Sequence, residues 1–399
     1  MRVLFANHTS SFSGAEVAML RLLESLPDGV ERAVACPPEG PLAAALDARG
    51  IRRLDMPGTD VSFKISPWST AKGLAQLAAS TTRLAQVARG WGADVIHANG
   101  TRAGLLAVPV ARAGGPALVV QVHDHLPHTR LGRLVRSGLA RGADEVIAVS
   151  RSTARNFDEG LSHPTATPVY ISIDLERFSG PHDDAGVRRE LGVGADTPLI
   201  GEVAQITPWK GQMDAVEAFA KVREEHPEAR LVLVGKVAFE SNRYDNHAYE
   251  RELHDRVREL GLERYVHFLG QRSDVPEIMS ALDVLVLPSW DEPFGTAALE
   301  AMAAGTVASV TSVGGASEYV EDGVAGRVLP PRDPDRWAAA ISELLREPDR
   351  RRAMARRAQA KAQAFTDRAY AEGCMAAYDR ALAFRGRADR LMPALDAQL

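Results

Sequence analysis

Short apolar segments alternate with longer amphipathic segments along the whole chain. Segments such as Leu231–Val234 and Val284–Leu287 are apolar at every position, as parallel strands covered by helices on both faces are. Between them, stretches such as Thr70–Arg89 place apolar residues three and four positions apart, which is the spacing of an amphipathic helix. This alternation predicts an α/β protein built from doubly wound parallel sheets.

The predicted strands form two series, which implies two domains. The first series consists of Val3–Phe5, Ala33–Cys36, Asp94–Ala98, Leu118–Val122, Glu145–Val149 and Val169–Ile173. The second consists of Leu199–Ile206, Leu231–Val234, Val266–Leu269, Val284–Leu287, Val307–Val310 and Gly326–Leu329. Predicted helices include Ala15–Leu26, Thr70–Arg89, Leu131–Ala140 and the whole tail from Asp333 onward, where no further strand is expected.

A polar, turn-rich segment at Ser179–Asp184 separates the two series, because such residues favour turns and linkers. We therefore expect an N-terminal domain at 1–180 and a second domain at 181–365, both Rossmann-like. Doubly wound sheets bind ligands outside the carboxyl ends of their strands. Two such domains in tandem would face each other across a cleft, and that cleft is the expected site.

Composition supports this picture and narrows the function. The 399 residues are 45% apolar and 25% charged, with a formal net charge of −5, which fits a folded two-domain protein and does not indicate a nucleic-acid binder. Residues 1–180 carry 19 basic and 16 acidic side chains, and the remainder carries 28 and 36. The basic first half and the acidic second half predict different partners for the two domains.

The remaining global features predict a soluble, cytoplasmic protein. The chain has two cysteines, Cys36 and Cys374, which are too few and too distant for a disulfide framework and favour a reducing compartment. Its first residues turn polar after one short apolar run, as a first strand does and a signal peptide does not. No apolar run approaches the length of about 18 residues that a membrane span requires.

The most informative segment lies between Ser289 and Gly305. A strand ends at Leu287, a loop with Pro and Gly follows, and a helix begins at about Gly295. The free N–H groups and the positive end of that helix form a site for an anion such as a phosphate. Glu292 and Glu300 flank this site, and carboxylates tolerate a phosphate nearby when they bind neutral donors such as sugar hydroxyls.

Glu292 and Glu300, seven residues apart within Glu-Pro-Phe-Gly…Leu-Glu-Ala-Met-Ala, resemble the E-x7-E motif of the retaining glycosyltransferases of family 4, which have the GT-B fold. The resemblance implies that Glu292 binds the transferred sugar and Glu300 the ribose. It also implies that the amides between them, at Phe294, Gly295 and Thr296, contact the sugar and the diphosphate. The alternative is a pair of surface carboxylates on an ordinary helix.

Two further segments of the second domain fit the same family. Gln205…Lys210-Gly211 is similar to the family's Gly-Arg-Leu-x-x-x-Lys-Gly, whose Arg and Lys clamp the donor diphosphate. Lys210 matches, although a solvated lysine at a helix start is the alternative, and Gln205 supplies hydrogen bonds without a charge. Gln271 and Arg272 fall where the family holds the nucleotide base. The glycine pair Gly314-Gly315 resembles a family segment that allows close backbone approach.

In the first domain, Ser13-Gly14-Ala15-Glu16 resembles the family's Gly-Gly-x-Glu loop, which places Gly14 over the donor phosphates. A simple helix start is the alternative. The segment does not match the GxGxxG fingerprint of dehydrogenases. The segment Tyr170…Phe178 resembles the family's interdomain junction, and by analogy the residues 366–399 form a helix that crosses back to the first domain.

His123, at the end of a predicted strand, matches in position the active-site histidine that contacts the transferred sugar in the family. His125 lies on the same face if the chain stays extended, so a metal site is an alternative, and a core histidine is another. Asp333-Pro334-Asp335 matches the metal-binding DxD of a different glycosyltransferase class, but its place at a helix start favours capping. We therefore expect no metal and no other cofactor.

A cluster of basic residues decorates the first domain: Arg130, Arg133, Arg136, Arg141, Arg151 and Arg155. A solvated basic face is the simplest interpretation. The alternative is contact with anionic lipid headgroups, which would place the protein at the inner face of the membrane, or with an anionic acceptor. The oligomeric state is not predicted.

Together the motifs predict a retaining glycosyltransferase that moves a hexose from a nucleoside-diphosphate sugar to a hydroxyl acceptor. Retention without a carboxylate nucleophile suggests displacement on one face of the sugar, and the metal role falls to Lys210 and the helix dipole. Two alternatives are an epimerase of nucleotide sugars with a similar fold and a non-catalytic two-domain sugar-binding protein. No motif selects the base, the sugar or the acceptor.

Overall fold

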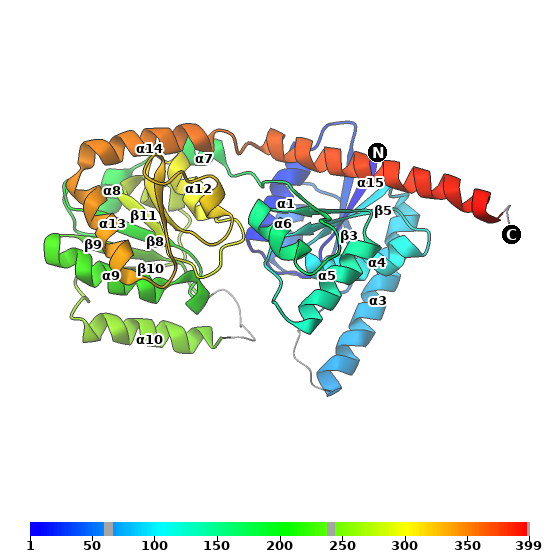
Figure 1. Ribbon diagram of the computed structural model, residues 1–399, viewed down its shortest axis with the longest axis horizontal. Coiled ribbons are helices and arrows are strands. Elements are labelled where there is room, and N and C mark those ends of the chain that lie inside the picture. The colour runs from blue at the N-terminus through cyan, green and yellow to red at the C-terminus, as the bar shows by residue number, and fades with distance from the viewer. Residues whose placement is uncertain (60–66, 238–243, 397–399) are drawn as a thin grey trace. The chain divides into compact units, whose positions relative to one another are not determined.

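The computed structural model describes residues 1–59, 67–237 and 244–396, and the chain divides into two compact units (Figure 1). Unit 1 holds Met1–Ser172 together with the last helix, and unit 2 holds Ile173–Thr366. Each unit contains one all-parallel sheet with helices on both faces. The predicted fold class is therefore confirmed.

Unit 1 has a seven-stranded sheet in the order β3-β2-β1-β4-β5-β6-β7. Its strands are β1 Arg2–Ala6, β2 Glu31–Cys36, β3 Arg53–Asp55, β4 Val95–Asn99, β5 Ala117–Val122, β6 Glu145–Ala148 and β7 Ala166–Pro168. Its helices are α1 Gly14–Ser25, α2 Pro41–Asp47, α3 Pro67–Trp91, α4 Thr101–Arg112, α5 Arg130–Gly142, α6 Arg151–Asp158 and α15 Asp367–Asp396.

The two faces of the unit 1 sheet differ in chemistry. One face packs apolar side chains such as Leu4, Ile96 and Val120 under α3, α4 and α5. The other face carries His97 and Gln121, both fully buried, and lies against α1 and α15. Alternate residues of a strand point to opposite faces, so one strand pair, β4 and β5, supplies both an apolar core and a buried polar row.

Unit 2 has a six-stranded sheet in the order β10-β9-β8-β11-β12-β13. Its strands are β8 Leu199–Val203, β9 Arg230–Val234, β10 Val266–Gly270, β11 Val284–Leu287, β12 Val307–Thr311 and β13 Gly326–Leu329. Its helices are α7 Leu175–Ser179, α8 Asp184–Glu190, α9 Gln212–Glu225, α10 Asn246–Glu259, α11 Val275–Ala281, α12 Thr296–Ala303, α13 Pro334–Arg346 and α14 Pro348–Ala362, with short 3₁₀ turns η1 Pro208–Lys210 and η2 Ala316–Glu318.

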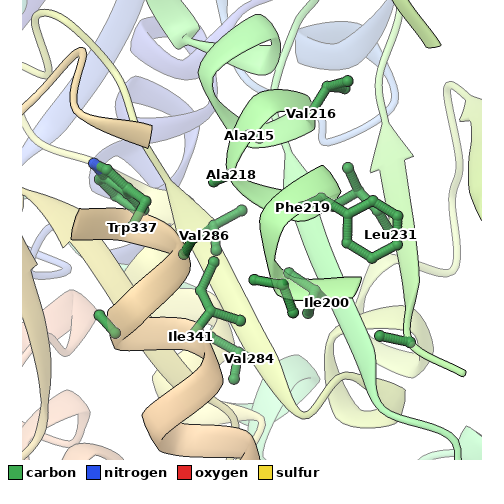
Figure 2. Close-up of a cluster of buried hydrophobic side chains, with 14 of the residues drawn as sticks. Ile200, Ala215, Val216, Ala218, Phe219, Leu231, Val284, Val286, Trp337 and Ile341 are labelled. Carbon is green, nitrogen blue, oxygen red and sulfur yellow. The ribbon is translucent and has the colours of Figure 1, made fainter. Parts of the chain in front are cut away.

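The core of unit 2 lies between its sheet and helices α9 and α13 (Figure 2). Phe219 of α9 and Trp337 of α13 are almost fully buried against strand residues such as Leu231 and Val286. The Trp337 indole N–H donates to the carbonyl of Pro330 at 2.8 Å, which satisfies its one polar group. This packing fixes the two strands, β8 and β11, whose carboxyl ends carry the candidate donor site.

The structure differs from the sequence prediction at three places. The strand predicted at Val169–Ile173 is wrong, because the last strand of unit 1 is β7 and the chain leaves the sheet after it. The strand predicted at Leu199–Ile206 ends at Val203. The third place is β3, an edge strand whose sequence Arg53-Leu54-Asp55 is mostly charged and gives no apolar pattern.

The contacts divide the chain at Ser172 and Ile173, earlier than the polar segment Ser179–Asp184, because α7 packs on α12 in unit 2. The chain passes from unit 2 back to unit 1 between Thr366 and Asp367. In the part of the chain that the structure describes, no helix is both long and apolar enough to cross a membrane.

Candidate active site

The carboxyl ends of β8 and β11 bring the two predicted donor motifs of unit 2 together. The Lys210 ammonium lies 2.8 Å from Oε2 of Glu292, and Ser289 Oγ donates to the same oxygen at 2.8 Å. The side chains of Lys210 and Glu292 are only 14% and 6% exposed. Forming a buried pair of this kind costs desolvation energy, and removing one partner is strongly destabilising.

Glycines allow the backbone to hold Glu292 from both sides. Gly211 (φ 84°) begins α9 and Gly295 (φ 89°) begins α12, both in the left-handed region that side chains other than glycine rarely adopt. A Cβ on Gly314 would lie 1.9 Å from the carbonyl oxygen of Glu292, and the Gly315 N–H donates to that oxygen at 2.8 Å. The close backbone approach predicted at Gly314-Gly315 is therefore present.

A second carboxyl group, Glu202 on β8, lies near this pair. Glu202 is 1% exposed, and neither of its carboxyl oxygens has a hydrogen-bond partner among the residues the structure describes. Burial raises the pKa of Glu202 well above its ordinary range; Lys210 opposes that rise, and Asp214 and Glu292 add to it. Burial thus favours the neutral form of Glu202, whereas Glu292 is the carboxylate that pairs with Lys210.

The N-terminus of α12 is open to a ligand. None of the N–H groups of Gly295, Thr296 and Ala297 donates a hydrogen bond to a described residue, and α12 has no side-chain cap. Phe294 is buried, whereas Thr296 and Glu300 are partly exposed. Unpaired N–H groups at a helix start attract anions, as the sequence predicted for this position.

Two tryptophans border the Lys210–Glu292 pair, and sequence reasoning did not assign them. The Trp290 indole N–H donates to Asp214 at 2.6 Å, and the Arg332 guanidinium lies 3.9 Å from the Trp290 ring centre. The Lys210 ammonium lies 4.2 Å from the Trp209 ring centre, a favourable cation–π distance. Both could have been predicted from the sequence, because Trp209 precedes Lys210 and Trp290 lies two residues before Glu292.

The remaining predicted donor residues are less enclosed. Gln205 is partly buried, and its carbonyl accepts from the Gln212 side chain at 2.9 Å. Gln271 is exposed, whereas the Arg272 guanidinium pairs with Glu190 at 2.6 and 2.8 Å and with Asp274 at 2.6 and 2.8 Å. These two carboxylates raise the pKa of Arg272 above its ordinary value. Its side chain is thus already engaged within unit 2.

In unit 1, His123 is connected by hydrogen bonds to the predicted Gly14 loop. His123 Nε2 lies 2.8 Å from Asn99 Oδ1, and the Asn99 amide donates to Asn7 Oδ1 at 2.9 Å. The Asn7 amide donates to Glu16 at 3.3 Å, and Glu16 accepts from the Ser13 N–H at 3.0 Å. Because Asn99 Oδ1 only accepts, the proton of the neutral His123 ring lies on Nε2.

Burial lowers the pKa of His123 to about 3, with His97 nearby adding to the effect. The ring is therefore neutral at physiological pH, and it contributes a dipole and a lone pair at Nδ1 rather than a charge. Gly14 itself is exposed, and a Cβ there would meet no atom within 4 Å. Its loop also starts α1 through the Ser13–Glu16 contact. The segment is therefore a helix start, which was the alternative interpretation.

His125 and the DxD-like segment have other partners in the structure. His125 Nε2 lies 3.4 Å from Ser152 Oγ, and the described part of the chain contains no group of three or more His, Cys, Asp or Glu side chains arranged to hold a metal ion. Asp333 accepts from the Arg336 N–H at 3.2 Å and so caps α13. Capping therefore explains the DxD-like segment, as predicted.

The basic face predicted in unit 1 needs one correction. Arg136 is only 2% exposed, and it donates to the backbone carbonyls of Leu126, Pro127 and Asn156. It stabilises a loop rather than meeting solvent. The other members of the cluster are exposed: Arg130, Arg133, Arg141, Arg151 and Arg155.

Comparisons with known proteins identify the family of the chain. Residues 184–361 match the family model described as glycosyl transferases group 1, and residues 13–172 match a glycosyl transferase 4-like domain. A D-inositol 3-phosphate glycosyltransferase of Stackebrandtia nassauensis is 32% identical over 75% of this chain and 71% of its own length. One of Corynebacterium aurimucosum is 30% identical over 63% of this chain and 61% of its own length, which is less than two thirds of that relative.

Solved structures show the same fold. Anabaena Alr3699/HepE in complex with UDP-glucose has a TM-score of 0.80 and 26% identity over 93% of this chain and 97% of that one. The sucrose-phosphate synthase of Thermosynechococcus elongatus has a TM-score of 0.75 and 21% identity, covering 99% of this chain and all of that one. The chain belongs to family 4 of the glycosyltransferases, which have the GT-B fold. The resemblance stated from the motifs is thus confirmed.

Proposed function

We propose that this glycosyltransferase moves a hexose from a nucleoside-diphosphate sugar to a hydroxyl acceptor, with retention of configuration and without a metal. The observation that carries the proposal is the buried Lys210–Glu292 pair beside the unpaired N–H groups that begin α12. A cation and aligned N–H groups suit a diphosphate, and a hydrogen-bonded carboxylate suits sugar hydroxyls. The complexes of HepE with UDP and UDP-glucose make a UDP-sugar the first donor to test.

In this proposal unit 2 holds the donor. The diphosphate binds Lys210, Gln205 and the N–H groups of Gly295 and Thr296, while Glu300 accepts from the ribose hydroxyls. Glu292 accepts from hydroxyls of the transferred sugar. Gln271 and Arg272 hold the base through their backbone, since the Arg272 side chain is paired with two carboxylates. Unit 1 binds the acceptor and contributes His123 and the Gly14 loop.

The chemical step is a displacement on one face of the sugar. The bond from the anomeric carbon to the diphosphate oxygen breaks, and the acceptor oxygen bonds to that carbon from the same side. The departing diphosphate oxygen takes the acceptor's proton. Lys210 and the α12 N–H groups stabilise the charge that develops on this oxygen, which is the role that a metal plays in other transferases.

A nucleotide panel tests the proposal. The protein is mixed with UDP-, GDP-, ADP- and TDP-sugars, with and without EDTA, and its melting temperature and slow donor hydrolysis are followed. We expect one nucleotide to raise the melting temperature, since a ligand at 100 times its Kd stabilises by about 2.7 kcal/mol, and EDTA to leave hydrolysis unchanged. Loss of activity in EDTA would contradict the metal-free step.

Product analysis separates the rival functions. Retention predicts that donor and product have the same anomeric configuration, which the coupling constant of the anomeric proton reports. An epimerase would form product without any acceptor, and a sugar-binding protein would bind without turnover. The named relatives act on D-inositol 3-phosphate, so a phosphorylated cyclitol is one acceptor to test beside glycans and lipid-linked sugars.

We also propose that α5 contacts an anionic membrane surface. Leu131 and Leu134 of this helix are 39% and 69% exposed, and Arg130, Arg133 and Arg141 are exposed on the same helix. Apolar and basic side chains exposed together favour an interface with anionic lipid. The protein should float with vesicles containing phosphatidylglycerol and not with phosphatidylcholine alone, and Leu134→Glu should weaken this binding.

A further inference from the structure

The hydroxyl group of Tyr319 contacts the backbone on both sides of Gly295. Tyr319 follows η2 and is 6% exposed. Its hydroxyl oxygen lies 2.6 Å from the carbonyl oxygen of Gly295 and 3.1 Å from that of Phe294. One O–H is thus shared between two consecutive carbonyl groups, and the shorter distance marks Gly295 as its main acceptor.

These contacts set the direction of two N–H groups. In a trans peptide unit the C=O and the N–H of the next residue point in opposite directions. The units that join Phe294 to Gly295 and Gly295 to Thr296 both turn their carbonyls toward Tyr319. The N–H groups of Gly295 and Thr296 therefore point away from Tyr319, and neither donates to a described residue.

Gly295 also has a left-handed backbone conformation. Gly295 has φ 89° and ψ 50° and precedes the right-handed residues of α12, so left-handed and right-handed residues follow each other here. Such a pair makes successive N–H groups converge on one side, where an anion binds. A Cβ on Gly295 would lie 3.0 Å from the Tyr319 hydroxyl and 3.0 Å from Ala316, so the loop and Tyr319 fit closely.

An aromatic cluster holds Tyr319 in place. Its ring centre lies 5.7 Å from that of Phe294 and 5.4 Å from that of Phe365, and the two phenylalanine rings are 6.2 Å apart. These are favourable distances for aromatic pairs. Burial also keeps the pKa of Tyr319 well above its ordinary value, with Glu292, Glu300 and Glu318 adding to the rise. The hydroxyl therefore stays protonated and donates, and the rings of Phe294 and Phe365 hold the Tyr319 ring in place.

We infer that Tyr319 is a positioning residue for the donor diphosphate. Its hydroxyl orients the two peptide units before α12 and so directs the N–H groups of Gly295 and Thr296 at the diphosphate, without touching the ligand itself. The inference rests on the proposed function, because the anion it names is the donor's diphosphate. It adds a residue that the family motifs do not predict.

The test replaces Tyr319 by Phe, which keeps the ring and removes only the hydroxyl. The matched control is Tyr265→Phe, since the Tyr265 ring packs against the Arg223 and Arg230 guanidinium groups at a different part of unit 2. Calorimetry gives the affinities of each protein for three probes: the nucleoside diphosphate that binds best in the panel, the corresponding nucleoside, and inorganic pyrophosphate.

We expect Tyr319→Phe to bind the nucleoside diphosphate and pyrophosphate about tenfold more weakly, with the nucleoside affinity and the control unchanged. If Tyr319→Phe bound every probe with the wild-type affinity, the inference would be overturned. Equal weakening of diphosphate and nucleoside binding, which indicates general damage, would also overturn it. Phe365→Leu, which keeps the hydroxyl but loosens the ring, should show the same selective loss to a smaller extent and serves if Tyr319→Phe does not fold. A wild-type protein that binds no nucleoside diphosphate would instead refute the proposed function.

Discussion

The two sheets have the same parallel architecture, but their carboxyl edges are built on opposite principles. In unit 1 a buried network of mostly neutral side chains is paired internally: His97 bonds to Tyr378 at 2.8 Å and to Gln121 at 2.9 Å, and His123 bonds to Asn99. Nδ1 of His8, two residues after β1, has no partner among the described residues. In unit 2 the edge holds the charged pair Lys210–Glu292 and an unpaired acid. A satisfied network is rigid without a ligand, whereas an unsatisfied edge is stabilised by one.

From this difference we expect a ligand to stabilise the carboxyl edge of unit 2. At its edge, unpaired N–H groups, a buried lysine and Glu202 have no complete set of partners within the described residues. In the proposed function a diphosphate with its sugar would supply negative charge to the first two and hydroxyl donors to Glu292. In unit 1 the bonds of His123 to Asn99 and of Asn99 to Asn7 hold the His123 ring in one orientation and one tautomer.

The largest effect should come from breaking the charged pair. Lys210→Met removes the cation and leaves Glu292 buried without its partner, which costs about 3–5 kcal/mol of stability. Loss of leaving-group stabilisation should lower kcat by roughly 10²–10³. Lys221→Met is the control, because Lys221 pairs with Asp335 at an exposed site. Transfer by Lys210→Met within a few fold of the wild type would show that the pair is only structural.

A smaller effect should come from breaking the neutral network. The α15 hydroxyl of Tyr378 lies 2.8 Å from His97 Nδ1 in a fully buried position. Tyr378→Phe leaves that nitrogen without a partner, which should lower the free energy of unfolding by about 1–3 kcal/mol. Urea unfolding measures the change, with Tyr265→Phe as the control. An unchanged midpoint would mean that α15 does not depend on this bond.

The pH dependence also separates the two units, which should respond in opposite directions. Burial lowers the pKa of His97 to about 4 and that of His123 to about 3. Their contribution to stability is complete above about pH 6.5, the unfolded value, and is lost as the pH falls toward 4 and 3. The pKa of Glu202 is raised by burial, so its contribution is complete below about pH 4.3 and is lost as the pH rises.

Glu202→Gln isolates the unit 2 response. The amide keeps the shape and cannot ionise in the unfolded chain, so the variant should melt higher than the wild type at pH 8 and nearly equal to it at pH 4.5. Each kcal/mol corresponds to roughly 2–4 °C for a domain of this size. A lower melting temperature at pH 8 would indicate that Glu202 is ionised and paired in the native protein.

The strands and the motif residues could be predicted because their signal is local. Val284–Leu287 is apolar at every position, and β11 has these bounds. Lys210 and Glu292 lie in segments with a family resemblance, yet the bond between them joins residues 82 positions apart, which no local pattern reveals. The edge strand β3 was missed because its residues are mainly charged.

Other parts of the site escaped prediction because their role depends on three-dimensional contacts. Arg136 has the sequence context of an exposed helix residue, but it is buried and donates to the backbone carbonyls of Leu126, Pro127 and Asn156. Tyr319 lies in none of the motifs and has no pattern of its own. The role proposed for it depends on the contacts of its hydroxyl with the carbonyls of Phe294 and Gly295.

The central claim is that Glu292 binds the transferred sugar, and one variant tests it most directly. Glu292→Ala removes the carboxylate and frees Lys210 for the diphosphate. We predict that sugar transfer is nearly abolished while the nucleoside diphosphate still binds with at least the wild-type affinity; Glu318→Ala, to which no chemistry is assigned, is the control. Wild-type turnover in Glu292→Ala would contradict the account.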